Sequence, residues 1–262
     1  ILFQKFNDKG DLVYAVEIAD DFQDQGYRAI ELPNSYLVVG KTLALLEGES
    51  DSRKGDSVFV YINKPDGKII EAKRIGNNHF QQINDVILVN DANPYLIAIG
   101  RFYQNANEQS GLIMKLDLAT TIIWEKKYTL PNNIIEFRSI THAPGKGFYV
   151  VGSKRPSSQN HGDSLIARFN EGGFLLDTQV TTSQPDHDDF FSDVIHHQGR
   201  IVAIGRSTSG SNAVMYRVSS RSFPNREAVD TGSVQGGQVG VERGLIGVAA
   251  GACDGAEAGA GG

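Results

Sequence analysis

A short apolar run that ends in glycine recurs four times along the chain, and this repeat limits the possible folds more than any other feature. The copies are YLVVG (36–40), YLIAIG (95–100), FYVVG (148–152) and IVAIG (201–205). Their last residues, Gly40, Gly100, Gly152 and Gly205, are spaced by 60, 52 and 53 residues. Self-similarity at a nearly fixed period is typical of repeat architectures.

Three further signals recur with the same period. An apolar pair precedes each glycine run: Tyr27/Ile30, Ile83/Val86, Phe137/Ile140 and Phe191/Val194. An alternating segment that closes on a polar residue follows each run (58–63, 112–117, 165–170 and 214–219), and a fifth copy opens the chain at 1–7. A return segment comes after a short turn, at 11–18, 68–75, 121–128 and 174–180. Each repeat therefore predicts four short antiparallel strands, A to D.

Four-stranded units at this spacing favour an all-β fold, a β-propeller whose blades each pack on the next. The sequence predicts four blades, at about 26–75, 81–129, 136–181 and 190–229, with a half blade at 1–20. A parallel β-helix and a β-sandwich are the alternatives, and neither explains both the hairpin turns and the fixed spacing. The best helical candidate, TLALLE (42–47), would make only one or two turns.

The last residues, 231–262, form a Gly/Ala-rich tail that we expect to be flexible, because it has few side chains to offset the entropy of ordering. Two outcomes stay open for the half blade. The ring is incomplete, or residues 233–251 pair weakly with residues 1–18 to form a fifth blade. Because the chain opens at Ile1 inside an apolar alternation, we expect a fragment of a longer protein.

Composition excludes several function classes. The 262 residues carry a formal net charge of −6, which argues against binding to nucleic acid or to an anionic membrane. The single cysteine, Cys253, has no partner within the chain for a disulfide. No apolar run has the length of a membrane span. No G-x-S-x-G motif or phosphate-binding glycine loop occurs.

The repeats resemble the bacterial β-propeller repeats called delta-60 and their relatives. The residues that carry the resemblance are GDSVFVYINKPDGKIIEAKRI (55–75) and GDSLIARFNEGGFLLDTQV (162–180), with the glycine strands that precede them. Blade two departs from the pattern, with Ala119 and Thr120 at its turn. The resemblance implies a propeller in an exported bacterial protein, extracellular or at the cell surface.

The longer predicted loops, D–A and B–C, emerge on one face, and polar loops on a rigid scaffold commonly carry binding sites. The candidate residues on this face are Asn78, His79, Asn132, Asn133, Asp186 and His187. The cluster Asp186, Asp188 and Asp189 is a candidate site for Ca²⁺, which prefers oxygen ligands, although it lacks the spacing of a calcium loop.

These features predict a non-catalytic binding or scaffold module that recognises a protein or a glycan through the face of the long loops. The alternative is a propeller-fold hydrolase or lyase that acts on glycans or esters at the mouth of the central channel. Glycoside chemistry would need two carboxylates that converge in one pocket.

Overall fold

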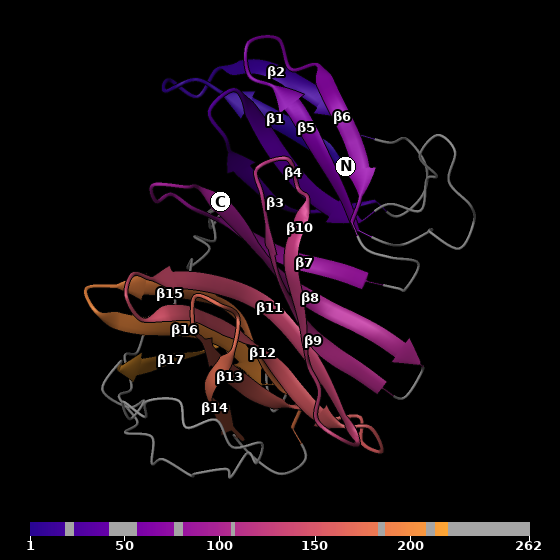
Figure 1. The fold of residues 1–262 in the computed structure, drawn as a ribbon, viewed down its shortest axis with the longest axis vertical. Coiled ribbons are helices and arrows are strands. Elements are labelled where there is room, and N and C mark those ends of the chain that lie inside the picture. Colours follow the sequence, from indigo (N-terminus) through magenta and orange to yellow (C-terminus); the bar gives the residue numbers. More distant parts are fainter. Residues whose placement is uncertain are drawn as a thin grey trace, which may run out of the picture.

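The structure, a computed structural model, describes residues 1–18, 24–41, 57–75, 81–105, 108–182, 187–207 and 213–219 (Figure 1). Within these residues it contains strands and turns and no helix, which confirms the predicted all-β class. In the same part of the chain, no helix has the length and apolar character needed to cross a membrane. The helical candidate at 42–47 and the tail at 231–262 lie outside the described residues.

The strands form an N-terminal hairpin and four units, within each of which neighbouring strands pair antiparallel in chain order. A short parallel pairing, Ile134 with Gln109, joins units two and three into one eight-stranded sheet. The hairpin is β1 (Leu2–Phe6) and β2 (Leu12–Glu17). Unit one is β3 (Gln25–Glu31), β4 (Ser35–Lys41), β5 (Ser57–Asn63) and β6 (Ile69–Arg74). Unit two is β7 (Gln81–Val89), β8 (Tyr95–Asn105), β9 (Glu108–Leu116) and β10 (Ile122–Tyr128). Unit three is β11 (Asn133–Ala143), β12 (Gly147–Pro156), β13 (Asp163–Phe169) and β14 (Leu175–Thr181). Unit four is β15 (Asp189–His197), β16 (Arg200–Ser207) and β17 (Ala213–Ser219).

Each unit carries a β-bulge in its first strand, directly opposite the repeated glycine. The pairing register shifts between Gly26/Arg28, Ile83/Asp85, Phe137/Ser139 and Phe191/Asp193. The four residues that the register skips are Tyr27, Asn84, Arg138 and Ser192. The register corrects one expectation, because Gly26 and Ala29, not Tyr27 and Ile30, correspond to the apolar pairs of the other units. The bulge adds a residue that the sequence pattern does not reveal.

The bulge explains why glycine recurs. A Cβ atom added at Gly100 would lie 1.8 Å from the carbonyl oxygen of Gln82, and one at Gly152 would lie 1.9 Å from that of Glu136. The corresponding distances are 2.1 Å at Gly205 and 2.4 Å at Gly40. No other residue fits so close to the bulged strand, so the glycine is a steric requirement of the bulge.

Apolar side chains fill the layers between successive units. In β8, Leu96 and Ala98 belong to a cluster shared with unit one, whereas Ile97 and Ile99 belong to a cluster shared with unit three. Alternate residues of a strand point to opposite faces, so each central strand contributes to two layers. This two-sided burial explains why the second strands are almost continuously apolar.

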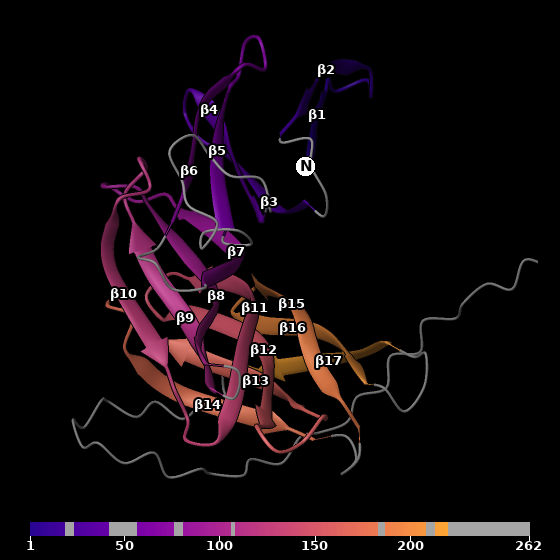
Figure 2. The same cartoon turned by 90° about the vertical axis from the view of Figure 1, so that its right-hand side faces the viewer.

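The hairpin and the four units follow one another along an arc, with the first strands β3, β7, β11 and β15 on its inner side (Figure 2). Each of β7, β11 and β15 packs against the preceding unit. The two ends of the arc leave apolar side chains exposed. On the hairpin these are Leu2, Phe6, Leu12 and Val13, and on unit four they are Ile195 and Ile204.

The turns between third and fourth strands are closed by a side chain that the repeat places there. The Asn170 Oδ1 atom accepts hydrogen bonds from the backbone N–H groups of Gly172 and Phe174, at 3.0 and 2.9 Å. The Asn7 Oδ1 atom accepts from Lys9 and Asp11 in the same way. The Asp117 Oδ1 atom accepts from the Thr121 N–H, so the Asn or Asp at this position forms the turn in the hairpin and in units two and three.

Candidate functional site

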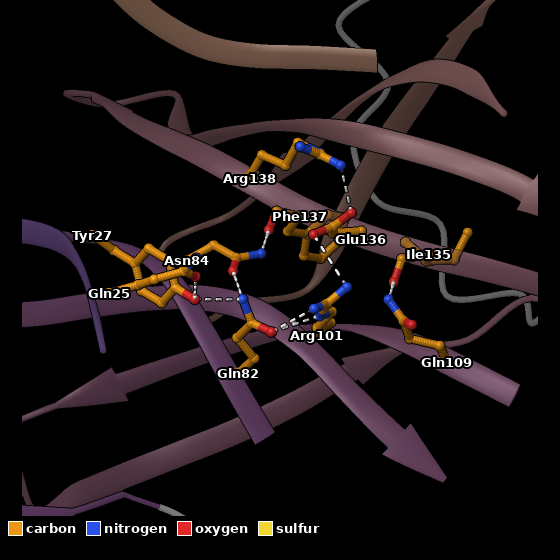
Figure 3. Close-up of polar contacts among 10 residues, drawn as sticks. All are labelled: Gln25, Tyr27, Gln82, Asn84, Arg101, Gln109, Ile135, Glu136, Phe137 and Arg138. Atoms are coloured by element: carbon orange, nitrogen blue, oxygen red, sulfur yellow. Dashed lines mark hydrogen bonds and ion pairs between the residues drawn. The ribbon is translucent and has the colours of Figure 1, made fainter. Parts of the chain in front are cut away.

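The bulges bring polar side chains of successive units together along the inner side of the arc. A bulge redirects neighbouring side chains and is common next to functional sites. In the first three units, the skipped residues are Tyr27, Asn84 and Arg138. The residues two positions earlier are Gln25, Gln82 and Glu136. All six belong to one network of hydrogen bonds and ion pairs, which Arg101 completes, and Figure 3 shows their side chains.

The network begins with contacts between units one and two. The Tyr27 hydroxyl donates to Gln25 Oε1 at 3.0 Å and accepts a hydrogen bond from Gln82 Nε2, also at 3.0 Å. The Gln82 amide also donates to Asn84 Oδ1 at 3.0 Å. The Asn84 amide in turn donates to the backbone carbonyl of Phe137 at 2.6 Å, so the bulge residue of unit two bonds to the bulged strand of unit three.

Two arginines and one glutamate continue the network into unit three. The Arg101 Nε atom donates to Gln82 Oε1 at 3.0 Å, and its Nη1 atom lies 3.5 Å from Glu136 Oε1. The second carboxylate oxygen of Glu136 accepts from Arg138 Nη2 at 2.8 Å. The side chains are 24% (Arg101), 17% (Glu136) and 34% (Arg138) exposed. Such partly exposed ion pairs can exchange one of their contacts for a ligand.

Aromatic rings border the two arginines. The Arg101 guanidinium lies 5.0 Å from the centre of the Tyr103 ring, and the Arg138 guanidinium lies 4.1 Å from that of Phe190. Burial raises the pKa of both Tyr27 and Tyr103, so their hydroxyl groups stay protonated at neutral pH. The site therefore offers neutral hydroxyls, amides, guanidinium groups and flat apolar surfaces, a set suited to recognising polar ligands.

A second polar cluster is formed by Asp85, Ser139 and Asp193, each of which comes directly after the skipped residue of its unit. The Ser139 hydroxyl lies 3.2 Å from Asp85 Oδ2 and 2.7 Å from Asp193 Oδ1, so it bridges carboxylates from units two and four. Backbone N–H groups of Val86 and Ile140 donate to Asp85, and Arg28 Nε lies 3.5 Å from it. Burial raises the pKa of Asp85 despite these contacts, which favour the anion.

Two of the predicted binding residues lie where β10 connects to β11, Asn132 in the turn and Asn133 as the first residue of β11. Asn132 is exposed and has a left-handed backbone with φ of 59°, and its carbonyl accepts a hydrogen bond from the Ser157 N–H. The Asn133 side-chain amide donates to the Pro131 carbonyl at 2.8 Å. Both asparagines shape the turn, which lies at the same strand end as the network.

The other predicted residues fall into two groups. His187 and Asp188 are half-buried before β15, Asp189 is buried, and Asp188 Oδ1 accepts from the Gly162 N–H at 2.9 Å. Asn78, His79 and Asp186 lie outside the described residues. Among the residues that the structure does describe, no group of three or more His, Cys, Asp and Glu could hold a metal ion. The calcium candidate includes Asp186 and remains a prediction.

Sequence reasoning missed the residues of the network, because it searched the loops rather than the strands. A signal was present in two units. A polar residue stands on each side of Ile83 and of Phe137, which in a strand places two polar side chains on the face opposite the apolar one. Arg101 directly follows the repeated Gly100 on the second strand, and it pairs with Gln82 on the first strand.

Comparison with known proteins gives one short match. A family model described as IMP cyclohydrolase-like protein matches residues 197–242, a segment that begins at the end of β15 and continues past the last described strand. It covers less than half of the chain and therefore assigns no family. A search of curated proteins finds no significant match to the chain.

Proposed function

We propose that this chain is a β-propeller module that binds a protein or a glycan and has no catalytic activity of its own. The propeller interpretation is supported by three successive four-stranded units and a fourth with three described strands, in which β7, β11 and β15 pack on the preceding unit. The resemblance to bacterial propeller repeats supports a place in an exported protein, at the cell surface or outside the cell.

The observation that carries the binding proposal is the network that joins Gln82, Arg101, Glu136 and Arg138. These side chains sit on rigid strands at the end of the units from which the longer loops emerge. Partly exposed arginines beside aromatic rings are frequent energetic centres of binding surfaces. A glycan hydroxyl or a peptide carbonyl can accept from a guanidinium group that the Glu136 carboxylate holds in position.

The hydrolase or lyase alternative has less support. Its best carboxylate pair is Asp85 and Asp193, which approach the same Ser139 hydroxyl. Both oxygens of Asp85 accept backbone hydrogen bonds, and the residue is only 5% exposed. A general acid must reach the substrate, so this arrangement favours a structural role for Asp85.

The binding proposal is tested by screening the purified chain on glycan and peptide arrays and measuring the affinity of hits by calorimetry. Arg138→Ala should weaken binding by about tenfold, the effect of about 1.4 kcal/mol. The matched control is Arg200→Ala, because Arg200 is an exposed arginine at the opposite end of the strands. Equal losses in both variants, or no specific binding to any array, would argue against the proposed site.

A further inference from the structure

The strand ends that form the polar network carry a cation in every unit. Three positions of each unit lie there: the skipped residue, the residue two places before it, and the residue after the repeated glycine, which pairs with the latter. Each unit has one cation among its three positions, and these are Lys41, Arg101, Arg138 and Arg206. The single acid at these positions is Glu136. A chain with a net charge of −6 therefore gathers positive charge at this end of its units.

Glu136 balances the charge of only one of the two arginines beside it. Its Oε2 atom accepts from Arg138 Nη2 at 2.8 Å, whereas its Oε1 atom lies 3.5 Å from Arg101 Nη1, which is longer than an ordinary hydrogen bond. Among the described residues, Glu136 is the one hydrogen-bond partner of the Arg138 guanidinium, and the buried Arg138 Nε atom has none. The two partly exposed arginines therefore keep N–H groups for a ligand and one net positive charge.

We propose that the ligand of this network is a glycan that carries carboxylate groups, as oligomers of uronic acids do. Its carboxylate accepts from the N–H groups of Arg101 and Arg138 that Glu136 leaves unused. This inference rests on the proposed function, because it names the ligand class for the same site. Guanidinium groups bind carboxylates through paired, charge-assisted hydrogen bonds. The spacing of the two arginines suits a carboxylate, since the two oxygens of Glu136 already approach both of them.

The surroundings of the two arginines favour a sugar over a protein segment. A protein interface usually has an apolar core. The large apolar side chains that are exposed in the described part of the chain all lie outside the network, and the rings of Tyr103 and Phe190 each face a guanidinium group. The other neighbours are amides and a hydroxyl, contributed by Gln25, Tyr27 and Asn84. These groups both donate and accept, as sugar hydroxyls require.

The position of Glu136 makes the charge of the ligand measurable. An acidic ligand would place its carboxylate beside that of Glu136, and like charges repel. Glu136→Gln should therefore tighten the binding of an acidic glycan by about threefold or more, while the amide oxygen still accepts from Arg138. For a neutral ligand, the same change should weaken binding or leave it unchanged, because no repulsion is relieved and the arginines lose an anchor. The direction of the change thus distinguishes the two ligand classes.

The test measures the binding of trimers of galacturonic acid and of glucuronic acid to the full chain by calorimetry. The matched ligands are the same trimers with methyl-esterified carboxyl groups, which keep the sugar skeleton and lose the charge. At least one acid trimer should bind about tenfold or more tightly than its ester. The difference should shrink in about 0.5 M salt, because salt screens the charges. This comparison uses the native chain, so it does not depend on the folding of any variant.

Three variants locate the interaction. Glu136→Gln should tighten the binding of the acid trimer, as argued above. Arg138→Lys keeps the positive charge but loses the planar set of donors, and should weaken binding by about fivefold. The matched control for Glu136→Gln is Glu71→Gln, because Glu71 is 55% exposed on β6 and its replacement changes the net charge by the same amount. This control should leave the affinity within about twofold, since distant surface charges are screened.

Several results would overturn the inference: equal affinity for the acid trimers and their esters, weaker binding by Glu136→Gln, or equal gains in Glu136→Gln and Glu71→Gln. Tighter binding of tetraglutamate than of both acid trimers would also overturn it, because the site would then recognise a protein carboxylate. Array hits that are neutral and depend on Arg138 would contradict the ligand class and leave the proposed function standing. Absence of specific binding to any array would contradict both.

Discussion

At the scale of single residues, one steric contact links the repeat to the candidate site. The carbonyl oxygens of Gln82 and Glu136 occupy the space that a side chain would need at Gly100 and Gly152. The same two residues contribute their side chains to the polar network. The glycine therefore permits a bulge, and the bulge directs polar side chains toward the inner side of the arc.

This link predicts a large effect of a single methyl group. Gly152→Ala should lower the free energy of unfolding by about 3 kcal/mol, because the new Cβ atom would force the bulged strand away. Urea denaturation measures the loss. The control is Gly145→Ala, at a turn with φ of +74° and nothing within 4 Å of the added atom, which should cost only about 1 kcal/mol. Similar costs at the two positions would contradict the steric explanation.

At the scale of strands, the sequence predicted the strands themselves but not the β-bulges within them. Apolar runs that end in glycine, apolar pairs, alternating segments and turn residues together indicated the seventeen described strands, because each of these signals is local. The bulges were not predicted, since one extra residue leaves the composition of a strand unchanged. The network was missed because its side chains lie on strands, whereas binding residues were expected in the loops. In unit one, the sequence pattern assigned Tyr27 and Ile30 to the repeated apolar pair. The strand register shows that Gly26 and Ala29, one residue earlier, hold these positions.

Contacts between strands also predict that the stability of the fold depends on pH. Asp85 on β7 is bound by the Ile140 N–H on β11 and lies near Ser139, and burial raises its pKa. An acid whose pKa is higher in the folded state stabilises the fold below its unfolded pKa, about 3.9, and this contribution is lost as pH rises through the folded value.

The stability advantage of the native chain over Asp85→Asn should therefore shrink as pH increases from below 4 toward neutrality. Urea denaturation of both proteins across this range measures the difference. Parallel stability curves for the two proteins would show that burial does not perturb Asp85.

At the scale of the whole molecule, packing between units determines both the stability of the fold and which polar side chains meet, and the repeat pattern alone predicts neither. Each unit exposes an apolar face that the next one covers, so stability depends on neighbours. Arg101 links Gln82 to Glu136, and the Ser139 hydroxyl lies beside Asp85 and Asp193, each of which is 54 positions away from Ser139 in the sequence. No local pattern shows which polar side chains will meet, so the candidate site became visible only once the units were arranged in space.

The central claim is that successive units are equivalent copies arranged around a common axis, with the polar network facing that axis. A crystal structure of the full chain tests it most directly. We predict that one repeated rotation about a single axis superposes each unit on the next and brings Gly40, Gly100, Gly152 and Gly205 to matching positions. Units related by translation along a line, or glycines that do not face a bulge, would contradict the account.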